Sequence, residues 1–348
     1  MSPSKPSLSW HFFAVFLFIL LAYAIPVFAD EAESKPESSG PKSSIKLLLV
    51  GNSFSRDATA YLPNLALAGG KKLVSLNACR GSGSFENHAN GINGIAKNPQ
   101  SPQARIYNRE GSYGIGGGLP DTFNLKEALT FDKWDFVTIQ QYSLLSFKPE
   151  TYEPYAHQVV DYIRQYAPQA EILVHETWPY REDDPSFKDG KFTSQKMYEG
   201  LKAAYAKLAD TYHLRIIPVG DAFAAAKATE HWHYVLDPTY DFEHPKPGVI
   251  PNQDGSLNAG YLWTGSGDKQ TLGLDAHHAS YAGRYLGSAV MYEVLYGDSV
   301  EHVSYCPPEL KPQQAEELRR IAHETMEAQK KGATDTGSGA EPAKDTLQ

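Results

Sequence analysis

The sequence predicts an α/β fold in which helices surround a mostly parallel sheet of five strands. Short apolar runs of the kind expected for buried strands occur at residues 47–50, 73–79, 136–139, 172–174 and 216–220. Segments with helical character alternate with these runs. Because strands that alternate with helices are joined by right-handed crossovers, the pairing is predicted to be parallel.

The helices are recognised by their ends and by their apolar stripes. The predicted helices lie at residues 63–68, 152–166, 194–212, 281–295 and 309–330. Pro63 suits a first helical turn, and Gly69-Gly70 stops that helix. Residues 98–125 are polar and glycine-rich, which indicates an irregular excursion. Pro218 in the fifth apolar run indicates an edge strand or the end of a strand.

One domain, residues 45–330, is predicted to follow an export signal. Residues 1–29 combine Lys5, an apolar stretch and small residues before a cleavage site after Ala29, the pattern of a secretory signal peptide. The apolar stretch is short for a membrane span. The prediction is therefore a secreted or periplasmic protein with no stable membrane association after cleavage. Residues 30–44 predict a disordered linker and residues 331–348 a disordered tail.

Composition narrows the classes of function. The 348 residues are 41% hydrophobic and 12% aromatic, as in a globular protein. A net charge of -9 is unlike a basic nucleic-acid footprint, so no nucleic-acid partner is predicted. The sequence has no phosphate loop, dinucleotide fingerprint or paired-cysteine spacing, so no cofactor or metal is predicted. Cys79 and Cys306 could pair in an exported protein, or Cys79 could be a buried thiol.

Residues 230–274 are predicted to form a long loop on the substrate side. The segment carries six aromatic side chains, and long loops in compact domains are usually functional or disordered. His231, His233 and His244 lie among carboxylates and could form a metal cluster. A solvated loop of mixed charge is the favoured interpretation.

Candidate chemistry lies in the turn after the first apolar run and at the mouth of the helix predicted at 281–295. Ser53 follows the first apolar run, and open α/β sheets bind ligands beyond the carboxyl ends of their strands. Asp275 and His278 stand three residues apart before the helix at 281–295, where a carboxylate can orient an imidazole. Hydrolysis by a serine needs such a base, its orienting group and donors to an oxyanion. The alternatives are a structural serine turn and a helix cap formed by Asp275 or Ser280.

Together these segments resemble the SGNH (GDSL-type) hydrolase superfamily over residues 45–296. The segments that carry the resemblance are Gly51-Asn52-Ser53-Phe54-Ser55, residues 81–84 and Asp275-Ala276-His277-His278. The resemblance implies a three-layer flavodoxin-like sandwich. It also implies that Ser53 is the nucleophile, His278 the base and Asp275 the group that orients the base, with His277 as a rival base. The implied oxyanion donors are the backbone N–H groups of Ser53 and of Gly81 or Gly83.

Two departures from the family pattern concern side-chain amides. Asn52 stands where the family has an aspartate, and Gln140-Gln141-Tyr142-Ser143 stands where the family has Gly-x-Asn-Asp. A glutamine amide can donate to an oxyanion from one methylene further away. Gln141 is therefore predicted as the third oxyanion donor, with Gln140 as its rival. These departures resemble a little-characterised bacterial subfamily of the SGNH hydrolases.

Four residues are predicted to bind substrate. Asn52 lies in the serine turn, and Trp178, Tyr180 and Arg181 follow the fourth apolar run. Aromatic rings and an arginine suit a sugar or an acyl group, although they could equally cover the edge of the sheet. The function predicted is an exported serine esterase or acetylesterase that acts on a carbohydrate or another small ester. The alternative is a non-catalytic protein that binds a carbohydrate or another ligand in the same cleft.

Overall fold

The computed structural model describes residues 40–337, and the side chains of all of these except residues 268 and 332–337. The predicted signal peptide, most of the predicted linker and residues 338–348 of the predicted tail lie outside the described residues. The described residues, 40–337, belong to one compact unit. The signal peptide and the location of the protein therefore stay predictions.

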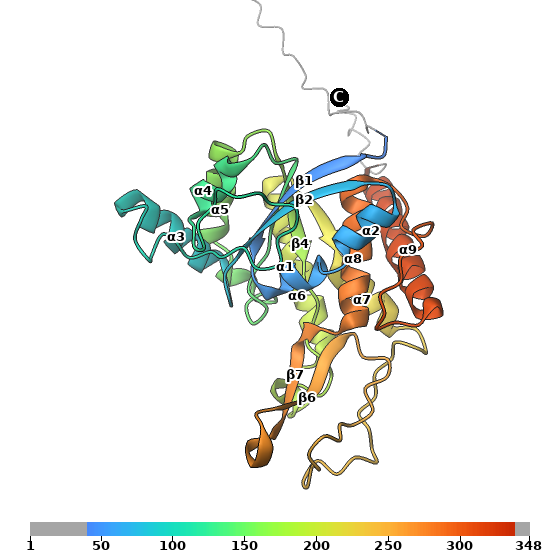
Figure 1. Cartoon of the computed structure of the whole chain (residues 1–348). Helices are drawn as coiled ribbons and strands as arrows, with labels where there is room; N and C mark the ends of the chain where they lie inside the picture. Colours follow the sequence, from blue (N-terminus) through green and yellow to red (C-terminus); the bar gives the residue numbers. More distant parts are fainter. Residues whose placement is uncertain (1–39, 338–348) are drawn as a thin grey trace, which may run out of the picture. The chain divides into compact units, whose positions relative to one another are not determined.

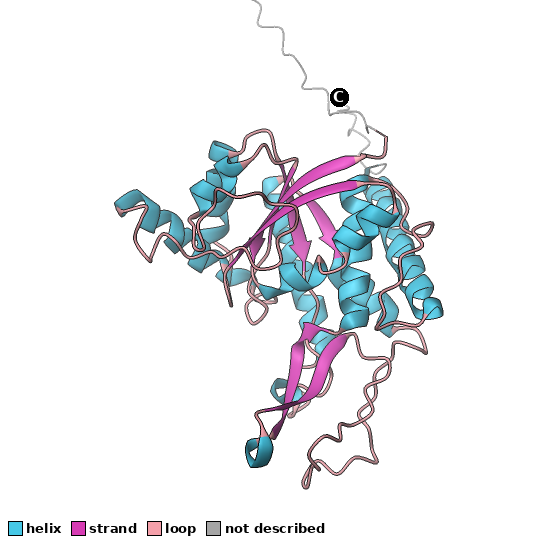
Figure 2. Cartoon of the chain, viewed as in Figure 1, coloured by secondary structure: helices cyan, strands magenta, loops and turns pink. Residues whose placement is uncertain are grey.

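A five-stranded, all-parallel sheet forms the centre of the fold, which confirms the predicted fold class (Figures 1 and 2). Its strand order is β2-β1-β3-β4-β5. The strands are β1 (Ser44–Gly51), β2 (Lys72–Cys79), β3 (Phe136–Ile139), β4 (Glu171–Glu176) and β5 (Arg215–Pro218). Pro218 ends the edge strand β5, as its missing N–H requires.

Helices cover both faces of this sheet. The helices are α1 (Ser53–Ala58), α2 (Leu62–Ala68), α3 (Phe85–Lys97), α4 (Leu125–Phe131), α5 (Tyr155–Tyr166), α6 (Ser194–Tyr212), α7 (Val219–Lys227), α8 (Tyr281–Tyr296) and α9 (Pro312–Gly337). Short 3-10 turns occur at η1 (Pro149–Thr151), η2 (Pro185–Phe187) and η3 (Gly267–Lys269). In Figure 1, α3, α4 and α5 lie on one side of the sheet, and α2, α8 and α9 on the other.

Strand β1 lies at the centre of the hydrophobic core. Leu47, Leu48 and Leu49 of β1 are fully buried, and so are Val137 of β3 and Val290 of α8. A strand buried on both faces reads as a continuous apolar run. This is the reason that the leucine run at residues 47–49 marked the strand in the sequence.

The structure differs from the prediction in several elements. Helices α1, α3, α4 and α7 were not predicted, and α9 continues to Gly337 where the prediction ended it at residue 330. The predicted loop at 230–274 contains β6 (Asn258–Thr264) and most of β7 (Thr271–Ala279), an antiparallel two-stranded ribbon. We call the ribbon together with residues 228–257 the arm. It projects from the body of the domain in Figure 1.

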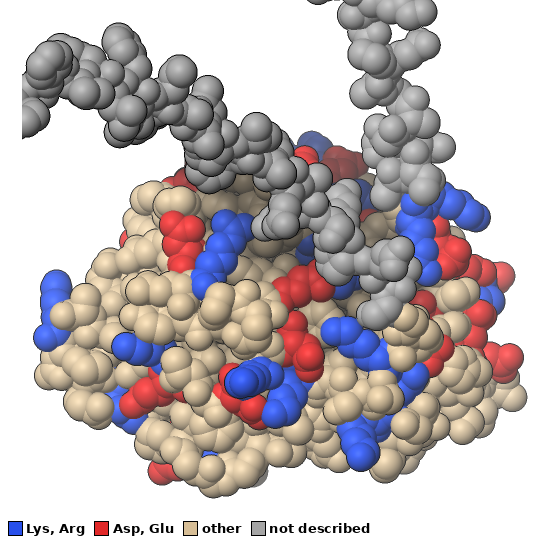
Figure 3. Space-filling view, turned by 90° about the horizontal axis from the view of Figure 1, so that it is seen from above, with Lys and Arg blue, Asp and Glu red and all other residues tan. Residues whose placement is uncertain are grey.

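The surface carries both signs of charge. In the face shown in Figure 3, acidic and basic side chains are interspersed. None of the helices within residues 40–337 combines the length and apolar character needed to cross a membrane.

Cys79 is buried and Cys306 half-buried, and both are free thiols, so the two do not form a disulfide in this structure.

Candidate active site

Ser53 is the first residue of α1, directly after the sharp turn that ends β1. The preceding Asn52 caps α1, because its Oδ1 accepts a hydrogen bond from the Phe54 N–H at 2.9 Å. Glycine is required at position 51, since a Cβ there would lie 2.1 Å from Ser55 Oγ. The turn therefore fixes Ser53 at the carboxyl edge of the sheet, where open α/β folds bind ligands.

His278 and Asp275 reach Ser53 from the end of β7. His278 Nε2 lies 2.8 Å from Ser53 Oγ, and His278 Nδ1 lies 2.8 Å from Asp275 Oδ2. The other carboxylate oxygen of Asp275 accepts from the backbone N–H groups of His277 and His278. The sequence placed this pair at the mouth of a helix. In the structure the pair belongs to a strand, and Ser280 caps α8, which follows.

Asp275 and His278 each favour the charged form of the other. The hydrogen bond from His278 to Asp275 raises the pKa of His278, against the effect of partial burial. Burial on its own would raise the pKa of Asp275, but hydrogen bonds from the His278 ring and backbone hold that pKa well below its usual range. Asp275 is therefore ionised near neutral pH, and His278 binds a proton more readily than a free imidazole.

Two buried side chains hold the segment that carries His278. Asp57 of α1, which is 1% exposed, accepts a hydrogen bond from the Ala279 N–H at 3.0 Å. Trp178 donates from its indole N–H to the His277 carbonyl at 2.9 Å and stacks on Phe54. The position of the imidazole is thus fixed against the helix that carries Ser53. Sequence reasoning missed Asp57, although it stands one helical turn after Ser53.

His277, the rival base, has a different partner. Its Nε2 lies 2.9 Å from Asp184 Oδ2, and its ring packs against Tyr180 with 3.9 Å between the ring centroids. The structure therefore places His278 beside Ser53 and His277 beside Asp184.

The turn after β2 distinguishes the two candidate glycines. The Gly83 N–H donates to the Arg80 carbonyl at 2.9 Å, and the Gly83 carbonyl accepts from Asn52 Nδ2. Gly83 is buried, and its N–H is committed to this turn. The N–H groups of Gly81 and Ser53 have no acceptor within residues 40–337. Gly81 is therefore the better candidate of the two glycines for an oxyanion donor.

Gln141, predicted as the third oxyanion donor, has a structural role instead. It is fully buried, its Oε1 accepts from the Phe85 and Tyr142 N–H groups, and its Nε2 donates to the Thr151 carbonyl. The prediction for Gln141 is wrong because these neighbouring backbone groups already use its amide. A buried polar group is stabilised by such partners.

Its rival Gln140 is also committed. Gln140 is 1% exposed, and its Nε2 donates to Asn52 Oδ1 at 2.8 Å. Its Oε1 accepts from Ser55 Oγ at 2.8 Å and lies 2.7 Å from His175 Nδ1. This buried network ties the ends of β1, β3 and β4 together. Sequence reasoning did not place His175 in this network.

The four residues predicted to bind substrate are buried. Asn52, Trp178, Tyr180 and Arg181 are at most 3% exposed. Asn52 Oδ1 accepts hydrogen bonds from the Phe54 N–H and from Gln140 Nε2. Tyr180 OH lies 2.8 Å from Ser143 Oγ. In this structure these residues support the site from behind and do not line its surface, which argues against the prediction that they bind substrate.

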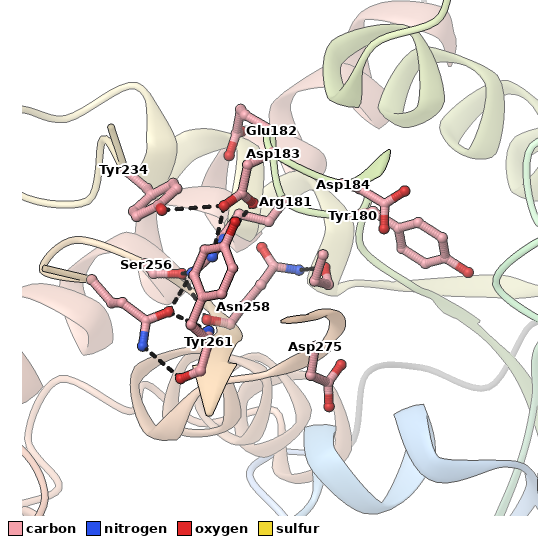
Figure 4. A network of polar contacts seen from close by, with 12 residues as sticks. Tyr180, Arg181, Glu182, Asp183, Asp184, Tyr234, Ser256, Asn258, Tyr261 and Asp275 are labelled. Carbon is pink, nitrogen blue, oxygen red and sulfur yellow. Dashed lines mark hydrogen bonds and ion pairs between the residues drawn. The ribbon is translucent and has the colours of Figure 1, made fainter. Parts of the chain in front are cut away.

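Arg181 is the centre of the cluster shown in Figure 4. Its guanidinium group donates to both carboxylate oxygens of Asp183 at 2.7 and 2.8 Å and to Gln253 Oε1 at 2.9 Å. It also lies against the rings of Tyr234 and Tyr261. Because these partners come from the body and from the arm, Arg181 fastens the base of the arm that carries His278.

The histidines of the arm are dispersed among separate partners. His231 Nδ1 lies 3.2 Å from Glu317 Oε2 on α9, and His244 pairs with Asp241 of its own loop. Among the side chains that the structure describes, no group of three or more His, Cys, Asp or Glu could hold a metal ion.

Comparison with solved structures places this fold among known ones. A DUF4886 family protein from Bacteroides uniformis is 24% identical, with a TM-score of 0.62 over 81% of this chain and 95% of that chain. This likeness shows the fold alone. A candidate SGNH hydrolase from Slackia heliotrinireducens is 18% identical, covering 72% of this chain and 98% of that chain, with a TM-score of 0.43. The acetylxylan esterase Axe2 from Geobacillus stearothermophilus is 12% identical, covering 75% of this chain and 97% of that chain, with a TM-score of 0.40.

The last two TM-scores are too low to support an argument about function. No curated protein matches this chain. The model of the family described as a domain of unknown function (DUF4886) matches residues 46–237, more than half of the chain. The chain therefore belongs to the DUF4886 family.

Proposed function

We propose that this protein is an exported serine esterase that hydrolyses a carbohydrate ester or another small ester by acyl transfer to Ser53. The observation that carries the proposal is the continuous series of contacts from Asp275 through His278 to Ser53, with 2.8 Å at each side-chain step. This is the arrangement of nucleophile, base and orienting group that activates a serine hydroxyl.

The mechanism follows from these contacts. Asp275 accepts the Nδ1–H of a neutral His278, which leaves Nε2 free to accept the proton of Ser53 Oγ. The serine oxygen attacks the ester carbonyl, and the backbone N–H groups of Ser53 and Gly81 donate to the oxyanion. His278 then protonates the leaving alcohol. Water, activated by the same imidazole, releases the acyl group from Ser53.

A second candidate function, binding of a ligand without hydrolysis, is supported by the hydrogen bonds that Gln140 and Gln141 already make. Because Gln140 and Gln141 are both committed, the proposed oxyanion site relies on two backbone donors. One missing donor typically raises the barrier by about 2.7–4 kcal/mol. A protein with such a deficit could bind an ester or a glycan without turning it over. The esterase remains the favoured function, because Ser53, His278 and Asp275 are all in contact.

The esterase proposal is tested by hydrolysis of p-nitrophenyl acetate and longer acyl esters. The protein is compared with Ser53→Ala and His278→Ala, and His277→Ala serves as a neighbouring histidine control. We expect both of the first variants to lose at least about 10³-fold in kcat/KM, while His277→Ala keeps most of the activity. Equal activity in wild type and Ser53→Ala would reject Ser53 as the nucleophile. Circular dichroism checks that each variant is folded.

Export is tested separately. Cleavage after Ala29 predicts a mature protein that begins at Asp30 and that accumulates outside the cytoplasm. N-terminal sequencing of the protein recovered from a bacterial expression host measures the cleavage site directly. An intact residue 1 in the exported fraction would contradict the predicted signal peptide.

A further inference from the structure

A cavity of about 800 Å³ lies along α3, between this helix and residues 101–106. We call it the α3 groove. Its volume is within the range of small-molecule sites, which is about 300–1,000 Å³. It adjoins the proposed oxyanion turn, because Arg80 and Asn87 line it. The Arg80 N–H donates to the Gly51 carbonyl, and its guanidinium donates to the Gly81 carbonyl.

Most of the side chains that line the α3 groove carry polar groups, and none of them is acidic. Four asparagines, one glutamine and one serine line the α3 groove, with Arg80 and Lys97 as the cations and with no aspartate or glutamate. The chain as a whole has a net charge of -9, so the contrast with the groove is marked. Amide groups both donate and accept hydrogen bonds, as sugar hydroxyls do. Ile106 and Pro102 are the apolar side chains of the lining, and apolar surface of this kind can pack against the C–H faces of a sugar ring.

Several of these side chains are available for a ligand. Asn90, Lys97 and Gln103 are exposed, and within the described residues their side chains have no hydrogen-bond or ion-pair partner. By contrast, Asn87 Oδ1 accepts from the Ser84 N–H, and Asn93 Oδ1 accepts from Gln158. The free amides and the free ammonium group therefore lie along the middle and the far end of the groove.

Two glycines shape its floor. A Cβ at Gly91 would lie 2.8 Å from Ile106 Cδ1, and a Cβ at Gly94 would lie 2.8 Å from the Gln103 carbonyl oxygen. Both glycines let α3 approach residues 103–106 closely. The lining runs along α3 from Asn87 to Lys97, a rise of about 15 Å at 1.5 Å per residue, which exceeds one sugar ring.

We propose that the α3 groove binds the oligosaccharide part of the ester substrate, so that an acyl group on the chain reaches Ser53. This inference rests on the proposed esterase function and names its substrate class. Asn90, Lys97 and Gln103 determine specificity for a sugar chain. Arg80 connects the groove to the oxyanion turn.

The test compares a small ester with acetylated oligosaccharides. The probes are p-nitrophenyl acetate and a panel of acetylated xylo-, manno- and gluco-oligosaccharides, with the protein purified after expression of the full chain. The double variant Asn90→Ala, Lys97→Ala is compared with a matched control, Asn64→Ala, Lys207→Ala, whose side chains are exposed and lie outside the groove. Binding of the corresponding unmodified glycans is measured on an array.

We expect the groove variant to raise KM for the best oligosaccharide by about ten-fold or more, from the loss of two polar contacts. Hydrolysis of p-nitrophenyl acetate stays unchanged, and the control variant behaves as wild type. Equal effects on both substrates, or none, would overturn the proposal, as would hydrolysis of p-nitrophenyl acetate with no oligosaccharide accepted. If no ester is hydrolysed, the proposed esterase function fails. The array then tests the α3 groove on its own: glycan binding that is lost in the Asn90→Ala, Lys97→Ala variant would support the groove as a sugar site, and the absence of any bound glycan would overturn that proposal.

Discussion

Asp275 acts on the proposed base in two separate ways. It accepts the Nδ1–H of His278, which fixes the tautomer, and it raises the pKa of the imidazole. A neutral amide in its place would retain the shape of the site. It would lose the charge and could present its NH₂ group to Nδ1, which would favour the wrong tautomer.

Asp275→Asn is therefore expected to change both the size and the pH dependence of activity. The value of kcat should fall by up to about 10⁴-fold, the cost of the wrong tautomer in such a triad. Because His278 loses the group that raises its pKa, the acidic limb of kcat/KM should move to lower pH. The measurement is a pH–rate profile from pH 4 to 9 on p-nitrophenyl acetate. An acidic limb at unchanged pH would show that His278 is not the titrating base.

Gln141 illustrates what a motif could and could not predict. The sequence placed an amide at the end of β3, and this position is correct. It did not reveal which groups lie around that amide. Those groups are the N–H of Phe85 and the carbonyl of Thr151, from segments that are irregular or were not predicted as helix. Ser53, His278 and Asp275 were predicted together because the segments that carry them resemble the motifs of the SGNH hydrolases.

Gln141→Ala separates stability from catalysis. The variant removes the hydrogen-bond partner of the Phe85 and Tyr142 N–H groups and of the Thr151 carbonyl, so the free energy of unfolding should fall by about 1–3 kcal/mol. Since Gln141 does not face the oxyanion, kcat/KM of the folded protein should change by less than about ten-fold, against 10²-fold or more for an oxyanion donor. Urea unfolding and esterase kinetics are both measured, with exposed Gln195→Ala as the control. A stable variant with a large loss of kcat would restore Gln141 as an oxyanion donor.

At the scale of elements, the arm is the part that the sequence described least well. Residues 230–274 read as a loop because glycines and polar residues interrupt the strand pattern. Two of those glycines, Gly265 and Gly267, lie in the segment between β6 and β7 and have positive φ. Tyr261, Leu262 and Trp263 have high strand propensity, and they were the available signal for β6.

The glycine in β6 shows why the arm needs the body to define its shape. Gly260 has a φ of +87°, and a Cβ there would lie 2.2 Å from Arg181 Nη1. The close approach of β6 to a buried arginine is a contact between distant segments. Local pattern does not encode such a contact.

Arg181 is expected to be the anchor of this element. In Arg181→Ala, the carboxylate of Asp183 loses its bidentate partner in a nearly buried position, so the free energy of unfolding should fall by about 3–5 kcal/mol. Arg215, paired with Glu171 at the surface, is the matched control, and Arg215→Ala should cost no more than about 1 kcal/mol. Urea unfolding monitored by tryptophan fluorescence measures both. Equal losses in the two variants would show that the cluster does not anchor the arm.

At the scale of the whole molecule, the sheet order explains how distant residues meet. Strand β1 lies inside the sheet between β2 and β3, so the turns that carry Ser53, Gly81 and Gln140 are neighbours at one edge. His278 arrives from 225 residues further along the chain, through the arm and against α1. Alternating strands and helices predicted this sheet. The arm lay outside that rule, and its path depends on Arg181, Asp57 and Trp178.

The same burial that builds the core sets a limit on stability in acid. His88 and His175 are buried, and burial lowers the pKa of each to about 3. Nε2 of each has no hydrogen-bond partner among the described residues. In the unfolded chain both histidines take up a proton near pH 6.5, while in the folded chain they stay neutral down to about pH 3. The unfolded state therefore binds more protons between these pH values, and stability falls as the pH is lowered.

Each of these two histidines should reduce the free energy of unfolding by roughly 1.4 kcal/mol for every pH unit below 6.5, until the pH reaches the folded pKa. Urea unfolding at pH 7.0, 5.5 and 4.5 measures the slope in wild type and in His88→Gln, which removes one titrating group. The variant is less stable at pH 7, because the contact with Tyr107 is lost, but its slope should be shallower. Parallel slopes in wild type and His88→Gln would mean that His88 is already protonated in the folded protein and that acid sensitivity arises elsewhere.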